Sequence, residues 1–252
     1  MAVDFHTEGH VAVFTLNRPE ARNAVNETVS AEMEAHLDAF EADPSLWVGI
    51  ITGTGPVFCA GADLKAVAEG RNIMTKRGGF AGLVKYPRTK PIIAAVDGPA
   101  LAGGMEIALA SDLIVASTAA RFGIPEVKRS LVAAAGGLFR GPRALPRNVA
   151  MELALTGDPI SAERAAELGL VNELCEPGQA MERAMALADR IATNAPLAVR
   201  ASRRVIIEAE FADDDTAWRL SNEAMRGLAA TDDFKEGPRA FIEKRAPNWT
   251  GS

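Results

Sequence analysis

The sequence predicts an α/β fold, because strand-like and helix-like segments alternate early in the chain and helices dominate late. Apolar runs separate amphipathic stretches in the first half, whereas from about residue 148 apolar residues recur almost only at helical spacing. With 252 residues, 48% of them hydrophobic and 24% charged, the composition is that of an ordinary globular domain. We expect an α/β core over residues 1–190 and a helical C-terminal extension over residues 191–252, within one fold unit.

Local patterns place the early elements. Residues 11–16 (VAVFTL) are rich in β-branched and aromatic side chains and predict a strand, which Pro19 cannot continue. Residues 27–42 carry apolar side chains at spacings of four, four and three, which form one face of an amphipathic helix. Asp63 is expected to cap a further helix. The other strands of this half are expected at residues 48–52, 57–59, 92–96 and 112–116.

The rest of the chain is predicted to be mainly helical, with one late strand at residues 171–174. Before it, the polar and Gly-rich residues 69–80 are expected to form a mobile loop. Helices are expected at residues 107–110, 151–155, 162–168, 181–193, 197–210, 216–229 and 234–244.

Composition and charge exclude several classes of function. The three histidines all lie within the first 36 residues, and the two cysteines, Cys59 and Cys175, are far apart. Zinc sites, disulfide frameworks and His-dependent triads are therefore not expected. The net charge of −6 contains no basic block, so we expect no nucleic-acid surface. No apolar run reaches the roughly 18 residues that cross a bilayer, and Asp4 follows closely on Met1, so we expect a cytoplasmic protein without a membrane partner.

Two turns rich in glycine and alanine are the first candidates for ligand binding. Residues 58–64 (FCAGADL) and 101–106 (LAGGME) each lead from a strand through small residues into a helix. The first N–H groups of a helix have no intrahelical partner, and small side chains let a ligand approach them. Two such turns facing each other would offer two donors to one oxyanion. The same residues also permit tight strand–helix packing, so composition alone leaves both interpretations open.

Two glutamates in apolar surroundings are the candidate acid–base groups. Glu106 lies near the start of the second of these helices, and Glu126 follows Pro125 in an apolar stretch. Burial raises the pKa of a carboxyl group, as a general acid or base near neutral pH requires, although Glu106 could also simply cap its helix.

Nicotinamide and ATP chemistry are not expected. Residues 53–55 begin like a dinucleotide motif, but Phe58 replaces its third glycine, and no Walker loop is present.

The chain resembles the enoyl-CoA hydratase/isomerase (crotonase) family over essentially its whole length. The matching segments, in their joint order and spacing, are residues 17–19 with 23–24, 58–64, 103–108, 122–126, 135–137, 155–157, 166–171 and 241–245. The resemblance implies a crotonase-like spiral of repeated ββα units with a helical C-terminal trimerisation region. It further implies an acyl-CoA substrate, no cofactor other than the coenzyme A of that substrate, and a homotrimer or homohexamer.

The resemblance also implies roles for individual residues. The thioester oxygen is expected between the N–H groups of Ala60 and Gly103. Phe241 and Lys244 are expected to approach coenzyme A, from the same or a neighbouring subunit, and Lys65 and Lys244 supply local positive charge. The remaining substrate-binding residues implied by the resemblance are Ala24, Ala62, Asp63, Leu64 and Gly104.

The two glutamates lead to a specific expected reaction. Family members that hydrate a double bond have glutamates at the positions of Glu106 and Glu126, which are 126 − 106 = 20 residues apart. The resemblance therefore implies an enoyl-CoA hydratase, which reversibly adds water in the syn sense to a 2-trans-enoyl-CoA and gives a 3-hydroxyacyl-CoA. We favour Glu106 as the base and Glu126 as the proton donor, with the reverse assignment left open.

Acyl specificity stays open at this stage. Ala134 replaces a glycine that lies close to the catalytic water in many hydratases, and together with residues 236–245 it resembles the branch that includes carnitinyl-CoA dehydratase. A carnitinyl-CoA (crotonobetainyl-CoA) dehydratase and an enoyl-CoA isomerase of the same fold are therefore alternatives. A non-catalytic acyl-CoA-binding protein is the alternative from another class.

Overall fold

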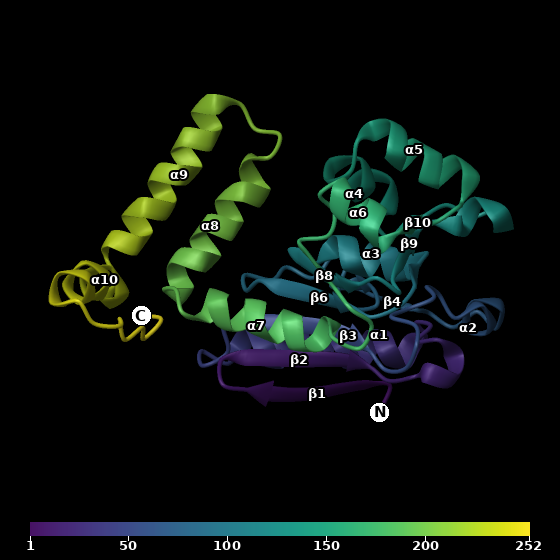
Figure 1. Cartoon of the computed structure of the whole chain (residues 1–252), viewed down its shortest axis with the longest axis horizontal. Coiled ribbons are helices and arrows are strands. Elements are labelled where there is room, and N and C mark those ends of the chain that lie inside the picture. Colours follow the sequence, from purple (N-terminus) through teal and green to yellow (C-terminus); the bar gives the residue numbers. More distant parts are fainter.

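A six-stranded sheet forms the centre of the computed structural model, which describes all 252 residues (Figure 1). Its strands lie in the order β1-β2-β3-β6-β8-β11, and all neighbouring pairs are parallel except β1 and β2. The strands of this sheet are β1 (Val3–Glu8), β2 (Val11–Leu16), β3 (Val48–Gly53), β6 (Ile92–Val96), β8 (Leu113–Ser117) and β11 (Glu173–Cys175). β6 is buried at every position, as expected for a parallel strand covered on both faces.

Helices α1 (Glu27–Ala42) and α7 (Ala180–Ala192) cover opposite faces of this sheet. Successive side chains of a strand point to opposite faces, so Phe14 of β2 packs in the cluster that contains α1, and Val13 packs in the cluster that contains α7. The buried residues that α7 contributes are alanines at every fourth position, Ala180, Ala184 and Ala188.

Two small sheets and several short helices stack above one end of the large sheet (Figure 1). Their strands are β4 (Met74–Thr75), β5 (Gly79–Phe80), β7 (Ala100–Leu101), β9 (Arg121–Gly123) and β10 (Ile160–Ser161). The helices are α2 (Leu64–Ala68), α3 (Gly103–Ala110), α4 (Gly137–Ala144), α5 (Arg147–Thr156), α6 (Ala162–Glu167) and the 3₁₀ helices η1 (Pro19–Ala21) and η2 (Pro125–Arg129). β7 and β9 pair in parallel with Leu101 opposite Gly123, which brings the starts of α3 and η2 together.

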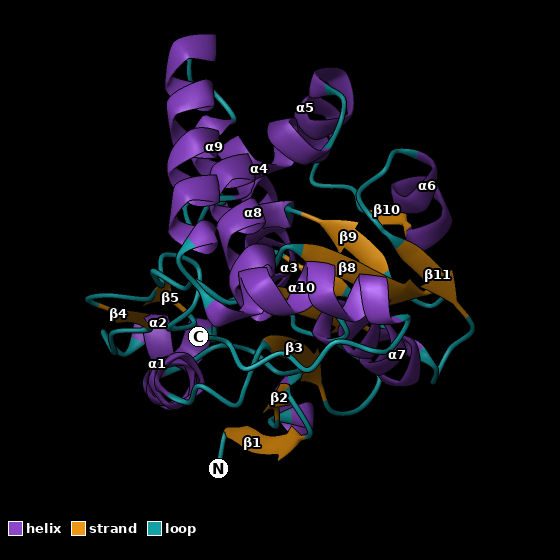
Figure 2. Ribbon diagram, turned by 90° about the vertical axis from the view of Figure 1, so that its left-hand side faces the viewer, coloured by secondary structure: helices purple, strands orange, loops and turns teal.

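The last three helices project away from the core. They are α8 (Pro196–Ala209), α9 (Asp214–Ala229) and α10 (Asp232–Glu243), and Figure 2 shows α8 and α9 packed side by side. They and the connection between α8 and α9 expose large apolar side chains, including Ile206, Phe211, Trp218, Phe241 and Ile242. None of the helices is both long enough and apolar enough to cross a membrane. The predicted boundary at residue 190 falls in the last turn of α7.

The α/β fold with helices late in the chain is confirmed, and α1 and β6 have the predicted bounds. The strand predicted at residues 57–59 is wrong, because this segment makes only one bridge, from Cys59 to Ala100.

Three further elements differ from the prediction. The loop predicted at residues 69–80 contains the hairpin of β4 and β5, whose last residue, Phe80, is buried. The edge strand β1 was not predicted, because its outer half is exposed and polar. Helix α4 was not predicted either, because it begins at Gly137 and contains Pro142.

Candidate active site

The two Gly/Ala-rich turns face each other at the starts of α2 and α3. A Cβ atom on Gly61 would lie 3.0 Å from the backbone N of Gly103, and a Cβ atom on Gly103 would lie 3.3 Å from the Cα of Gly61. Gly61 has a φ of 98°, and Ala102, which precedes α3, has a φ of 53°. A positive φ typically costs a residue other than glycine roughly 1–3 kcal/mol, so the surrounding structure must enforce the turn at Ala102.

Two backbone N–H groups lie free where the turns meet, those of Ala62 and Gly103. The N–H of Ala60 instead donates to the carbonyl oxygen of Arg22 at 3.0 Å. The prediction of Ala60 as an oxyanion donor is therefore wrong, because its N–H is already used within the chain. The free N–H of this turn is that of Ala62. A bridge to Val25 uses the backbone groups on either side of Ala62 and leaves its N–H unpaired.

An ion pair between Arg18 and Asp63 stabilises the first of the two turns. Arg18 donates through Nη1 to the carbonyl oxygen of Ala24 at 2.6 Å, and its Nη2 lies 3.0 Å from Oδ2 of Asp63. The other carboxylate oxygen of Asp63 accepts from the N–H groups of Lys65 and Ala66 and so caps α2, as predicted. These contacts gather Ala24 and Asp63, two predicted substrate-binding residues, around the Ala62 N–H.

The second turn is packed tightly from both sides. A Cβ atom on Gly104 would clash with the carbonyl of Cys59, and one on Gly103 would clash with the ring of Phe80. Gly104 is therefore required for strand–helix packing, which was the alternative interpretation of these small residues. At Gly103 both interpretations apply, because the residue must be small to pack against Phe80 and its N–H is also free.

Glu106 lies in the first turn of α3 and is only 3% exposed. Its Oε1 accepts a hydrogen bond from the N–H of Gly137 at 2.9 Å. Burial raises the pKa of Glu106, and the N–H groups of Gly137 and Ala135 oppose this rise. Burial lowers the pKa of Arg140, but its guanidinium stays charged. This positive charge favours the ionised form of Glu106 and so lowers the pKa of Glu106.

Glu126 follows Pro125 in η2 and has a different environment. Its Oε2 is buried and has no hydrogen-bond partner. Burial, followed by the nearby charge of Glu106, raises the pKa of Glu126 to about 7. The two carboxyl groups are therefore close enough to interact, and Glu126 is the one that more readily holds a proton near neutral pH.

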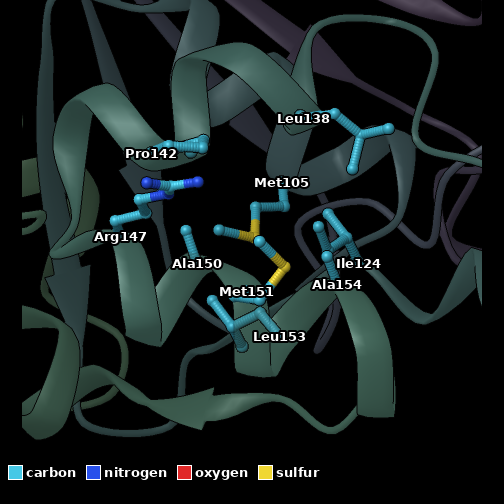
Figure 3. Close-up of a pocket in the computed structure, with 11 residues that line it drawn as sticks. Met105, Ile124, Leu138, Pro142, Arg147, Ala150, Met151, Leu153 and Ala154 are labelled. Atoms are coloured by element: carbon cyan, nitrogen blue, oxygen red, sulfur yellow. The ribbon is translucent and has the colours of Figure 1, made fainter.

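An apolar pocket of about 290 Å³ is lined mainly by residues of α3, α4 and α5 (Figure 3). Gly137, whose N–H binds Glu106, forms part of its wall together with Met105 and Ile124. Arg147 is the only charged residue that lines it. The structure contains no group of three or more His, Cys, Asp or Glu side chains that could hold a metal ion.

Some predicted residues lie elsewhere. Phe241 is 85% exposed in α10, which lies on the opposite side of the molecule from α2 (Figure 1), and Lys244 directly follows that helix. One chain alone does not bring these two residues to the turns, so their contact with a neighbouring subunit's ligand stays a prediction. Leu64 and Lys65 are exposed at the start of α2, and Ala134 is exposed in the loop before α4.

Sequence reasoning missed two residues that shape the site. Arg18 lies within a segment that matched the family, but no local pattern indicated that it would bind Asp63. Phe80 lies at the end of a Gly-rich stretch, and only the tertiary structure places its ring against Gly103.

Comparisons with known proteins give the relatives of this chain. The family model described as enoyl-CoA hydratase/isomerase matches residues 6–252. The chain is 43% identical over 248 residues to the enoyl-CoA hydratase EchA19 of Mycobacterium tuberculosis, covering 96% of this chain and 93% of that protein. It is 40% identical to the carnitinyl-CoA dehydratase of Proteus mirabilis, covering 97% of each. Among solved structures, an enoyl-CoA hydratase from Mycobacterium tuberculosis H37Rv has a TM-score of 0.97 and 50% identity, over 100% of this chain and 99% of that one.

Proposed function

This chain belongs to the enoyl-CoA hydratase/isomerase family, and we propose that it adds water reversibly to a 2-trans-enoyl-CoA to give a 3-hydroxyacyl-CoA. The observation that carries the proposal is the pairing of Glu106 and Glu126 beside two free backbone donors. A protein that only bound acyl-CoA would not need two carboxyl groups with raised pKa values.

The N–H groups of Ala62 and Gly103 are proposed to bind the thioester oxygen. Attack of water at Cβ transfers negative charge through the conjugated system to this oxygen, so the two donors stabilise the enolate more than the substrate. Their fixed backbone geometry supports this role, because no side chain has to reorganise. The charge stabilisation comes from the chain itself, so we propose that no metal or redox cofactor takes part.

Glu106 is proposed to act as the base and Glu126 as the proton donor. The N–H of Gly137 stabilises an ionised Glu106, which can take a proton from water as its oxygen attacks Cβ. The unpartnered oxygen and raised pKa of Glu126 favour its protonated form, which can give its proton to Cα. Delivery of both components from one side of the double bond gives syn addition.

We propose that coenzyme A binds along the first turn, near Ala24, Asp63 and the exposed Leu64. Backbone groups and the nearby cation Lys65 can bind a polyphosphate on a protein of net charge −6. Phe241 and Lys244 would complete this site from a neighbouring subunit in a homotrimer or homohexamer. The exposed apolar residues on α8–α10 support such an assembly. The two buried free cysteines are compatible with a cytoplasmic location.

A carnitinyl-CoA dehydratase is the second candidate, because a protein of that name is 40% identical. It would use the same glutamates and donors in the direction of water loss. Arg147, the only charged residue of the apolar pocket, would disfavour a cationic acyl group there. Parallel assays with crotonyl-CoA and crotonobetainyl-CoA separate the two activities.

The function is tested by following the loss of enoyl thioester absorbance with crotonyl-CoA and longer homologues. We expect Glu106→Gln and Glu126→Gln each to lower kcat by roughly 10²–10⁴, because each removes one acid–base group. The exposed Glu152→Gln is the matched control and should keep wild-type kcat.

Binding of the CoA esters without turnover at any chain length would contradict hydratase activity. Loss of activity in Glu126→Gln alone, with Glu106→Gln unaffected, would favour an isomerase instead.

A further inference from the structure

Arg140, in α4, is tied to the wall that carries the Gly103 donor. Its Nη2 donates to the carbonyl oxygen of Val84 at 2.7 Å. Val84 is buried and ends a turn in which its N–H donates to the carbonyl of Phe80 at 3.3 Å. The ring of Phe80 lies against Gly103. One end of the guanidinium is therefore attached to the segment that packs on the oxyanion donor.

The same guanidinium is tied to the loop that holds Glu106. Nη1 of Arg140 donates to the carbonyl oxygen of Ala135 at 3.3 Å, two residues before Gly137, whose N–H binds Glu106. The intervening Gly136 has a φ of 121°, and a Cβ atom there would clash with Nη1. The loop thus has a glycine at the position where the guanidinium of Arg140 approaches it most closely.

The charges around Glu106 come from two neighbouring elements. Arg140 in α4 favours the ionised form of Glu106, and the charge of Glu106 in turn raises the pKa of Glu126 in η2. Arg129 in η2 lowers the pKa of Glu126, and Arg143 in α4 lowers the pKa of Arg140. Neither residue contributes to the pKa shift of Glu106. Each glutamate therefore has one nearby cation, and Arg140 is the one that acts on Glu106 and is also hydrogen-bonded to the loop that holds it.

We propose that Arg140 is a positioning residue that holds Glu106 ionised and in place as the base, so that Glu126 carries the proton. This inference rests on the proposed hydratase function. It assigns the order of the two carboxyl groups to a side chain that acts through the carbonyl groups of Ala135 and Val84 and through its charge. The two carbonyl bonds fix the Gly137 loop and the Phe80 turn relative to each other, and the positive charge sets which carboxyl group ionises first.

The test compares pH profiles of kcat/KM for crotonyl-CoA hydration in Arg140→Met, Arg140→Lys and the wild type. The acid limb reports ionisation of the base in the free enzyme. Arg140→Met removes the charge, so the pKa of Glu106 should rise and the acid limb should move to higher pH by roughly one unit. We expect kcat to fall about 10-fold or more, with a smaller change in KM.

Arg140→Lys separates charge from geometry. It keeps the charge but loses the fork that spans two carbonyls, so its acid limb should stay near that of the wild type while kcat falls. Arg143→Met is the control, since it removes an exposed cation of the same helix and should leave the limb unchanged. Arg140→Gln provides the same test of charge if the methionine variant does not fold.

An acid limb in Arg140→Met or Arg140→Gln that coincides with the wild type would overturn the inference and leave only a structural role. Failure of the wild type itself to hydrate any enoyl-CoA would instead overturn the proposed function, so the two failures are distinguishable.

Discussion

The proposed oxyanion half of the site consists of backbone groups, whereas the proposed acid–base half consists of two side chains. In the first half, Gly61 and Gly103 approach so closely that side chains on them would collide with their surroundings. In the second half, Glu106 and Glu126 share a chemical identity but differ in their partners. The geometry of the first half depends on glycines that have no side chain. The protonation of the second half depends on the charges and hydrogen-bond donors near each carboxyl group.

This contrast explains how the two halves respond to substitution. A backbone donor cannot be removed by changing its side chain, so it is vulnerable mainly to displacement. A carboxyl group can be replaced by an isosteric amide that keeps its shape and loses its charge. Variants of the first half should therefore lower kcat by displacing a backbone donor. Variants of the second half should change how activity and stability depend on pH.

For the backbone half, the largest effect is expected from Gly103→Ala. The new methyl group would clash with Phe80 and displace the Gly103 N–H, so we expect kcat to fall by roughly 10²–10³. The matched control is Gly227→Ala in α9, where a Cβ atom meets nothing within 4 Å.

A double variant makes the cause specific. Phe80→Ala combined with Gly103→Ala removes the ring that collides with the methyl group and should recover part of the lost kcat. Equal activity in the single and double variants would show that displacement by Phe80 is not the cause.

A smaller effect on stability is expected from Glu126→Gln, which sharpens the comparison from the carboxylate side. Burial and Glu106 raise the pKa of Glu126 from an unfolded value of 4.5 to about 7 in the folded protein. A raised pKa gives stability that is complete below the unfolded pKa and is lost as the pH rises through about 7. The amide resembles the protonated acid, so the variant should match wild-type Tm at pH 4, below the unfolded pKa, and exceed it at pH 8.

Thermal unfolding of both proteins at several pH values measures this difference, with Glu152→Gln as the exposed control. A Tm difference between the Glu126 variant and the wild type that does not change with pH would show that Glu126 titrates normally.

The sequence could predict the elements whose patterns are local. Residues 27–42 have one apolar face, and residues 92–96 are uniformly apolar, so their bounds agree with the structure. The edge strand β1 lacks such a pattern because half of it is exposed and polar. Helix α4 lacks one because its glycines interrupt the helical spacing of apolar residues. Pairing partners such as β7 and β9 depend on the tertiary fold and could not be predicted from either segment alone.

The site divides in a similar way. Glu106, Glu126 and Gly103 could be identified from residue type and family spacing. The donor of the first turn was placed at Ala60 rather than Ala62, because the choice depends on a hydrogen bond to Arg22 from a distant segment. Arg140 was not singled out, because its significance arises from carbonyl groups of Val84 and Ala135 that the sequence does not show to be near.

The most direct test of the central claim is isotope incorporation during turnover of crotonyl-CoA. The reaction is run in heavy-oxygen water and, separately, in deuterium oxide, and the CoA products are examined by mass spectrometry and NMR. Water addition by Glu106 and Glu126 predicts heavy oxygen at Cβ and one deuterium at Cα, placed syn to that oxygen. Deuterium incorporation without heavy oxygen at Cβ would contradict hydration and indicate that the carboxyl groups only move protons.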